Sequence, residues 1–270
     1  MSFELDLNSR AGIKFKRVMK VGMIIGAMAG VIVMLIITGI VSVIKNNRHE
    51  KEVAKLETEI TELKKSNPAP AFIEDAAKQL QSEEDDWCLA LINAEYPMDV
   101  TYEPELVTLE EEMKVDARIL EDAKEMLAAA REEGLSPYVV SAYRSVDEQS
   151  QIFDSTMYTH LNTGMSMVEA YDETRLSVAL PGCSEHATGL ALDIVSSSYT
   201  NLDESQAETE EAKWLAEHCW EYGFILRYPP EKSDITGIIY EPWHYRYVGK
   251  DTAKEITEMG VTFEEYLGVK

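Results

Sequence analysis

After residue 114 the chain alternates between segments with helical spacing of apolar residues and short apolar runs. Residues 115–134 (VDARILEDAKEMLAAAREEG) are rich in helix formers, with Gly134 as a C-terminal stop. The predicted apolar face of this helix consists of Ile119, Leu120, Ala123, Met126, Leu127 and Ala130. The following run YVVSA, residues 138–142, is typical of a buried strand.

Two capping boxes predict the next two helices. Ser145 and Glu148 have the required spacing, because a serine at the N-cap and a glutamate three positions later satisfy each other's backbone donors. Ser166 and Glu169 repeat this spacing ahead of a second helix over residues 168–180.

The remaining segments are short and irregularly spaced. They comprise an alternating run at residues 190–195, a helix over 211–222 ending at Gly223, apolar pieces at 224–226 and 238–240, and a last helix capped by Asp251. Short strands separated by loops and flanked by segregated helices indicate an α+β fold rather than a regularly alternating doubly wound sheet.

One apolar segment near the N-terminus is too long for a domain core. Residues 21–44 (VGMIIGAMAGVIVMLIITGIVSVI) carry no charge, and at ~1.5 Å rise per residue they exceed the ~30 Å hydrocarbon core of a bilayer. They predict a transmembrane anchor. A cleaved signal peptide is the alternative, but the run is longer than the ~7–15 residues of its apolar region and shows no clear cleavage site.

The basic residues on the two sides of this segment give only a modest topological bias. We expect residues 1–20 to be cytoplasmic and the main part of the chain to lie outside the cell, as a single-pass protein of the cell membrane. Residues 45–70 predict an amphipathic helical stalk, ended by Asn67-Pro68-Ala69-Pro70. The folded domain is therefore assigned to residues 71–270.

Composition excludes some classes of partner. The net charge of -24 argues against nucleic-acid binding, which requires clustered Lys and Arg on the binding face. Three cysteines, Cys88, Cys183 and Cys219, permit at most one disulfide, and their spacing does not say which pair would form it. None has the C-x-x-C spacing of a sulfur-rich zinc ribbon.

Three short segments carry candidate chemistry: SAYRS at 141–145, SEHATGLALD at 184–193 and EPWHYR at 241–246. Singly, His186 could be a hydrogen-bonded loop histidine, Asp193 a turn or strand-end cap, and His244 a member of an aromatic cluster. Together they supply the three nitrogen and oxygen ligands of a catalytic Zn²⁺ with one open position. Gly189 permits a tight turn into a strand that would bring His186 and Asp193 to one metal.

Glu241 lies three positions before His244 and is the candidate general base and acid. Zinc lowers the pKa of a bound water towards ~7, and a nearby carboxylate can take its proton and return it to the leaving amine. Arg144 follows a predicted strand and precedes a helix N-terminus, where it can bind a substrate carboxylate. Ser184 and Gln149 are further candidate substrate contacts.

The motifs S-x-Y-R-S, S-E-H-x-T-G-L-A-x-D and E-x-W-H-x-R-Y-V resemble those of VanY-type D-alanyl-D-alanine carboxypeptidases. The resemblance extends from about Trp87 through Gly249. It implies a small antiparallel sheet with flanking helices, like that of lysostaphin-type peptidases and the hedgehog domain. It also implies zinc ligands His186, Asp193 and His244, a catalytic Glu241, and substrate contacts from Arg144 and Ser184.

The expected reaction is hydrolysis of the terminal D-Ala-D-Ala bond of a peptidoglycan stem peptide. An L,D-carboxypeptidase that removes D-Ala from a tetrapeptide stem would use the same zinc, base and carboxylate-binding groups, and the sequence does not separate the two. A non-catalytic peptide-binding module is disfavoured, because the three ligands and Glu241 are all present.

Overall fold

The computed structural model describes residues 51, 76–82, 85–98 and 102–270. It divides into two compact units, Met1–Ala69 and Pro70–Lys270, and the elements discussed below all belong to the second. The predicted cytoplasmic segment 1–20 and anchor 21–44 lie outside the described residues, as does nearly all of the stalk 45–70. Within the described ranges no helix combines the length and apolarity needed to cross a bilayer.

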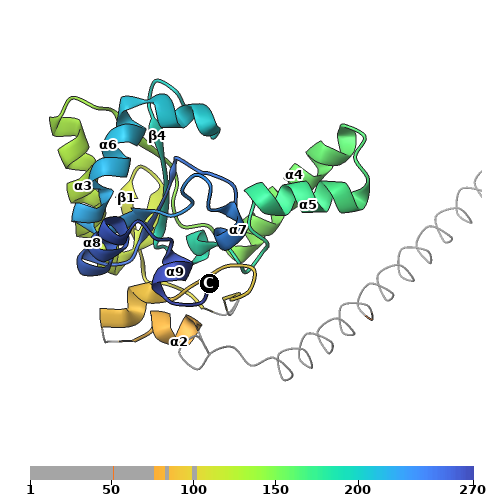
Figure 1. Cartoon of the computed structure of the whole chain (residues 1–270), viewed down its shortest axis with the longest axis horizontal. Helices are drawn as coiled ribbons and strands as arrows, with labels where there is room; N and C mark the ends of the chain where they lie inside the picture. The colour runs from red at the N-terminus through yellow and green to blue at the C-terminus, as the bar shows by residue number, and fades with distance from the viewer. Residues whose placement is uncertain (1–50, 52–75, 83–84, 99–101) are drawn as a thin grey trace, which may run out of the picture. The chain divides into compact units, whose positions relative to one another are not determined.

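A four-stranded antiparallel sheet forms the centre of the domain (Figure 1). Its order is β3 (Pro137–Ser141), β4 (Ala191–Ser196), β6 (His244–Tyr247) and β5 (Phe224–Leu226). A separate hairpin pairs β1 (Leu106–Glu110) with β2 (Met113–Asp116). The predicted α+β class with a small antiparallel sheet is therefore confirmed.

Helices lie on both sides of this sheet. The α-helices are α2 (Ala76–Leu80), α3 (Leu120–Glu132), α4 (Val146–Asn162), α5 (Met167–Ser177), α6 (Glu210–His218), α7 (Ser233–Thr236), α8 (Lys250–Met259) and α9 (Phe263–Tyr266). The 3₁₀ segments are η2 (Asp85–Leu89), η3 (Ala117–Ile119), η4 (Glu185–Thr188), η5 (Glu204–Glu208) and η6 (Cys219–Tyr222). Figure 1 shows α3, α6 and α8 on one side, with the α4–α5 hairpin projecting on the other.

Strand alternation gives the sheet two different faces. Leu192 and Ile194 of β4 and Tyr245 of β6 belong to the main hydrophobic core, which also takes in the buried face of α3. Because successive side chains point to opposite faces, Asp193 and His244 must lie on the other face. The main core therefore covers one face of the sheet, and the second face carries the buried polar side chains of Asp193, His244 and Arg246.

The strand register places three polar residues side by side on that second face. Asp193 of β4 pairs with Ser141 of β3 on one side and with His244 of β6 on the other. Directly opposed residues in antiparallel strands have Cβ atoms only about 4.5–5.5 Å apart. Antiparallel pairing thus brings together residues that are 51 positions apart in the sequence.

Both predicted capping boxes are confirmed. At the start of α4 the Ser145 hydroxyl accepts a hydrogen bond from the Glu148 backbone N–H, and the Glu148 carboxylate accepts one from the Ser145 backbone N–H. Ser166 and Glu169 make the same pair of bonds at the start of α5. The second helix ends at Ser177, short of the predicted residue 180.

Other predicted boundaries were wrong. Residues 115 and 116 belong to β2 because they pair with β1, so the helix expected over 115–134 begins later. Residues 238–240 form no strand, and α8 begins at Lys250 with Gly249 as its N-cap, so Asp251 is not the cap. The β1–β2 hairpin was not predicted.

The cysteines are buried. Cys183 and Cys219 are free thiols, so the disulfide that the sequence allowed does not join them. Burial raises the pKa of Cys219 to about 12 and that of Cys88 to about 11. Because the thiolate is the metal ligand and nucleophile, these side chains act as packing residues at neutral pH.

Candidate metal centre

Three potential metal ligands converge at the polar face of the sheet. His186 comes from η4, Asp193 from β4 and His244 from the first position of β6. One ligand atom from each lies within 4.8 Å of the others, and all three side chains are buried. His186 Nε2 is 3.2 Å from Asp193 Oδ2, and His244 Nδ1 is 3.0 Å from Asp193 Oδ1.

The remaining nitrogen of each imidazole has a partner on the opposite side of the ring. His186 Nδ1 lies 2.6 Å from the carbonyl oxygen of Ala142, and His244 Nε2 lies 3.4 Å from Glu185 Oε2. A histidine that donates one N–H to such an acceptor leaves its other nitrogen unprotonated and available as a ligand. Two such nitrogens and a carboxylate, all buried, form a donor set that fits Zn²⁺.

The pKa values of these groups reflect their mutual contacts. Burial raises the pKa of the Asp193 carboxyl, but attraction to His186 and His244 outweighs it and holds that pKa well below its ordinary value. Burial lowers the pKa of His186. For His244 burial also acts downward, yet hydrogen bonds to Asp193 and Glu185 raise its pKa to about 9. A metal binding at Nδ1 of His244 would therefore displace a proton.

Glu241 stands beside the ligands, in the loop before β6. Its Oε2 is 3.7 Å from His244 Nδ1, and its backbone N–H donates to the carbonyl of Tyr228. Burial raises the pKa of the Glu241 carboxyl to about 8, with Asp193 adding to the effect and His244 opposing it. A carboxyl with a pKa near the working pH can both accept and donate a proton.

Arg144 reaches the site from the loop between β3 and α4. Its Nη2 donates to Ser141 Oγ at 2.9 Å and lies 3.6 Å from Asp193 Oδ2. Its Nη1 donates to Gln149 Oε1 at 2.7 Å. The guanidinium is thus fixed at the edge of the ligand cluster and brings positive charge into an acidic molecule.

Gln149 and Ser184 are both buried. The Gln149 amide accepts from Arg144 through its oxygen and donates to the carbonyl of Ala179 at 2.7 Å through its nitrogen. Gln149 therefore orients Arg144. Ser184 precedes η4 as its N-cap residue and makes no side-chain capping bond there.

All the site residues predicted from the sequence line one cavity of about 490 Å³. They are Arg144, Gln149, Ser184, His186, Asp193, Glu241 and His244. Apolar side chains complete its wall, among them Ile152, Leu202, Ile238, Ile239 and Trp243. The cavity therefore combines a polar floor on the sheet with apolar sides.

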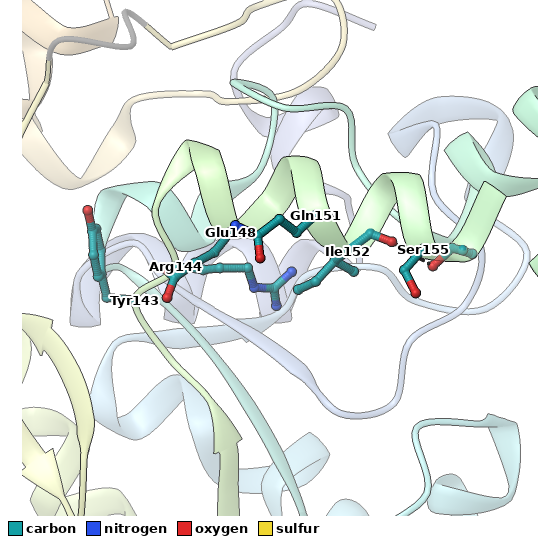
Figure 2. Close-up of a pocket in the computed structure, with 7 residues that line it drawn as sticks. Tyr143, Arg144, Glu148, Gln151, Ile152 and Ser155 are labelled. Carbon is teal, nitrogen blue, oxygen red and sulfur yellow. Dashed lines mark hydrogen bonds between the residues drawn. The ribbon is translucent and has the colours of Figure 1, made fainter. Parts of the chain in front are cut away.

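A second, more open cavity of about 600 Å³ runs along α4 (Figure 2). Arg144 and Ile152 line both cavities, so the two meet at these side chains. Figure 2 shows Arg144 extending along α4 toward Ile152, with Glu148, Gln151 and Ser155 following on the same helix.

Sequence reasoning missed two neighbours of His244. The ring centroids of Tyr228 and His244 are 4.9 Å apart, and Glu185 Oε2 lies 3.4 Å from His244 Nε2. No motif marks Tyr228. Glu185 stands inside the S-E-H motif, but its burial against His244 was not readable from the sequence.

Comparison with known proteins identifies related chains. The VanY family, described as D-alanyl-D-alanine carboxypeptidase, matches residues 112–250. A D-alanyl-D-alanine carboxypeptidase of Enterococcus faecalis is 38% identical over 196 residues, covering 72% of this chain and 71% of that protein.

Solved structures are similar over the same region. A mutant of the vancomycin resistance D,D-pentapeptidase VanY in complex with Zn(II) is 38% identical, with a TM-score of 0.62, covering 67% of this chain and 99% of that one. VanYB in complex with D-alanine-D-alanine is 38% identical, with a TM-score of 0.63 and coverage of 68% and 99%. The LD-carboxypeptidase LdcB is also 38% identical, with a TM-score of 0.60 and coverage of 69% and 88%.

Proposed function

Because this chain belongs to the VanY family of D-alanyl-D-alanine carboxypeptidases, we propose that it hydrolyses the terminal D-Ala-D-Ala bond of peptidoglycan stem peptides. It is a zinc carboxypeptidase by family. The observation that carries the proposal is the convergence of His186, Asp193 and His244 within 4.8 Å, in the cavity that Glu241 and Arg144 also line. A similar structure holds D-alanine-D-alanine.

Zinc would be held by His186 Nε2, His244 Nδ1 and the Asp193 carboxylate. When bound, the ion would lower the pKa of a coordinated water and polarise the carbonyl of the scissile bond. Each imidazole has a hydrogen-bond acceptor at its other nitrogen, Ala142 O for His186 and Glu185 for His244. The protein thus contributes a preformed, buried donor set.

Glu241 acts as the proton carrier. Its carboxylate accepts a proton from the attacking water and returns it to the amine of the departing D-alanine. Its position 3.7 Å from His244 Nδ1 places it next to the ligands without making it part of the converging set. Burial raises its pKa to about 8 in the metal-free protein, and a bound cation would lower that pKa and favour the proton-accepting carboxylate.

Arg144 binds negative charge on the substrate. Its guanidinium, oriented by Gln149 and Ser141, is the positively charged side chain in the wall of the catalytic cavity. A fork of N–H donors pairs well with a terminal carboxylate or with the oxygen that gains charge during attack. Ser184 adds a hydroxyl to the same wall.

L,D-carboxypeptidase activity is the second candidate, and a specific observation favours it. LdcB is as similar to this chain as VanYB is, at 38% identity. Both activities need the same metal, base and arginine, and they differ in the configuration of the residue before the scissile bond.

The two activities are separated by offering the full-length chain a pentapeptide and a tetrapeptide stem and identifying the released amino acids. We expect D-alanine from the pentapeptide, leaving a tetrapeptide. Release of D-alanine from the tetrapeptide alone would show that the enzyme is an L,D-carboxypeptidase and not a D,D-carboxypeptidase. Release from neither stem, by protein that contains zinc, would contradict the proposed function.

We further propose that residues 21–44 anchor the enzyme in the cell membrane, with residues 1–20 inside and the domain 71–270 outside. The uncharged apolar run supports this, since it is long enough to span a bilayer. The full-length chain should stay with membranes after alkaline carbonate washing, whereas a chain lacking residues 1–44 should be released. An unanchored full-length chain would refute the anchor and leave the proposed catalysis intact.

A further inference from the structure

His244 faces carboxylates with both of its ring nitrogens. Nδ1 is 3.0 Å from Asp193 and 3.7 Å from Glu241, on the side where the metal ligands converge. Nε2 points the other way and lies 3.4 Å from Oε2 of Glu185, a side chain with no exposed surface. The proton of a neutral His244 imidazole can therefore sit on either nitrogen, and only one choice leaves Nδ1 free for a metal.

Glu185 is held by two buried arginines. Arg227 Nε donates to Glu185 Oε1 at 2.8 Å, and Arg246 Nη1 donates to the same oxygen at 2.9 Å. Both arginine side chains are fully buried. Because the two cations use Oε1, the second oxygen of the carboxylate remains as an acceptor directed at His244.

The arginines are themselves fixed. Arg227 makes a bidentate pair with Glu264 of α9, at 2.9 and 2.6 Å. Arg246 donates through Nη2 to the carbonyl oxygens of Cys88 and Ala90 at 2.9 and 2.8 Å. Glu185 therefore has little freedom to turn away from His244.

We propose that Glu185 is a positioning residue for the zinc site, a role that rests on the proposed function. Its carboxylate accepts a hydrogen bond from the Nε2–H of His244, so that Nε2 keeps its proton when a metal binds and Nδ1 is the nitrogen directed at the metal. A carboxylate behind a metal-binding histidine fixes the tautomer and raises the basicity of the ligand. His186 has only a neutral carbonyl in the equivalent place, 2.6 Å from Nδ1.

Glu185→Gln tests this role because an amide offers one acceptor where the carboxylate offers two. If its oxygen stays with Arg227 and Arg246, its NH₂ group faces His244 Nε2. That contact favours the imidazole with its proton on Nδ1, which cannot bind the metal through that atom. The substitution therefore changes the tautomer preference while nearly preserving side-chain volume.

Glu264→Gln is the matched control. It removes a negative charge from the same buried cluster and disturbs Arg227. The Glu264 carboxylate accepts hydrogen bonds from Arg227 and Asn93, and none of these bonds involves His244. The zinc dissociation constants of wild type and both variants are measured on the full-length chain by competition with a chromophoric chelator. Thermal unfolding in excess EDTA reports the stability of each metal-free protein.

We expect Glu185→Gln to bind zinc about 10- to 100-fold more weakly, and Glu264→Gln to stay within about two-fold of wild type. The absorption spectrum of the Co²⁺-substituted protein should change only in Glu185→Gln. Equal loss of affinity in both variants, or an unchanged affinity in Glu185→Gln, would overturn the role. Zinc binding that depends on Glu185 without cleavage of either stem would contradict the proposed function alone.

Should Glu185→Gln not fold, the wild-type protein still decides the matter. Spectra of ¹⁵N-histidine-labelled, zinc-loaded protein should show His244 protonated at Nε2 and liganded through Nδ1. A His244 liganded through Nε2 would refute the positioning role.

Discussion

At the scale of single residues, three carboxylates around His244 have different tasks set by their surroundings. Asp193 contacts both histidines and keeps a pKa far below its ordinary value, as a metal ligand requires. Glu241 is buried, and burial raises its pKa to about 8 although His244 and Arg144 act to lower it. The negative charge of Glu185 is balanced by ion pairs with two buried arginines, Arg227 and Arg246. In the proposed mechanism the same functional group thus serves as ligand, proton carrier and hydrogen-bond acceptor.

Glu241→Gln should abolish most hydrolysis while zinc remains bound. The amide cannot accept the proton of the attacking water, and loss of a general base typically lowers the rate about 10²–10⁴-fold. The measurement is kcat on the cleaved stem peptide together with the zinc content of the purified variant. A variant with normal kcat would remove Glu241 from the mechanism, and one that loses zinc would make it a ligand.

Arg144→Ala should weaken turnover and leave zinc bound. Removing a charge-assisted fork from a substrate or transition-state oxygen typically lowers the rate about 10²–10³-fold. The variant's kcat and KM are compared with those of Arg175→Ala, which removes an exposed arginine of α5 that pairs with Asp172 and lines neither cavity. Normal kinetics in Arg144→Ala would show that another group holds the substrate's negative charge.

At the scale of elements, the site is a consequence of strand register. Pairing of Asp193 with His244 puts both on one face of the sheet, and alternation puts Arg246 on the same face of β6. Arg246 then reaches Glu185 in η4. A shift of one residue in this pairing would turn His244 towards the hydrophobic core, so the metal site requires this register.

Gly189 joins the segments that carry His186 and Asp193. It has φ +74°, and a Cβ there would lie 2.7 Å from the backbone nitrogen of Asp116 in β2. The Asp116 N–H also donates to the Gly189 carbonyl at 3.0 Å. Glycine is thus required for both the left-handed conformation and the close approach of the β1–β2 hairpin.

Gly189→Ala should therefore destabilise the domain more than Gly134→Ala does. Gly134 follows α3 with φ +83°, but a methyl group added there would meet nothing within 4 Å, so only the backbone conformation is penalised, by about 1 kcal/mol. Gly189→Ala adds a steric clash, for about 2–3 kcal/mol or more in total. Urea unfolding in EDTA measures both, and equal losses would contradict this packing argument.

At the scale of the whole molecule, the metal would connect segments that the chain otherwise keeps apart. His186, Asp193 and His244 come from η4, β4 and β6, so binding requires the folded arrangement of all three. A ligand that binds only the folded state stabilises it by mass action. Acidic side chains elsewhere give the protein its net charge of -24, while Arg144 supplies local positive charge for an anionic substrate.

Removing zinc should lower the melting temperature. At a free zinc concentration about 1,000 times the dissociation constant the stabilisation is about 4 kcal/mol, which corresponds to roughly 8–16 °C for a domain of this size. Calorimetry with zinc and with EDTA measures the difference. His186→Ala, which removes one ligand, should lose most of this shift, and a zinc-independent melting temperature in wild type would contradict the metal site.

The sequence by itself determined what is local. The capping boxes of α4 and α5, the runs that became β3, β4 and β5, and the seven polar candidate residues that line the catalytic cavity were predicted from neighbouring residue types and motifs. Helix caps and apolar runs act over a few positions, so their signal is complete within a short window.

Only the tertiary structure decided which distant residues face each other. Residues 115 and 116 joined a strand because β1 was available to pair with them. Glu185 became the partner of His244 because β5, β6 and α9 bring Arg227, Arg246 and Glu264 around it. Such contacts depend on strand register and helix packing between remote segments, which no short window of sequence contains.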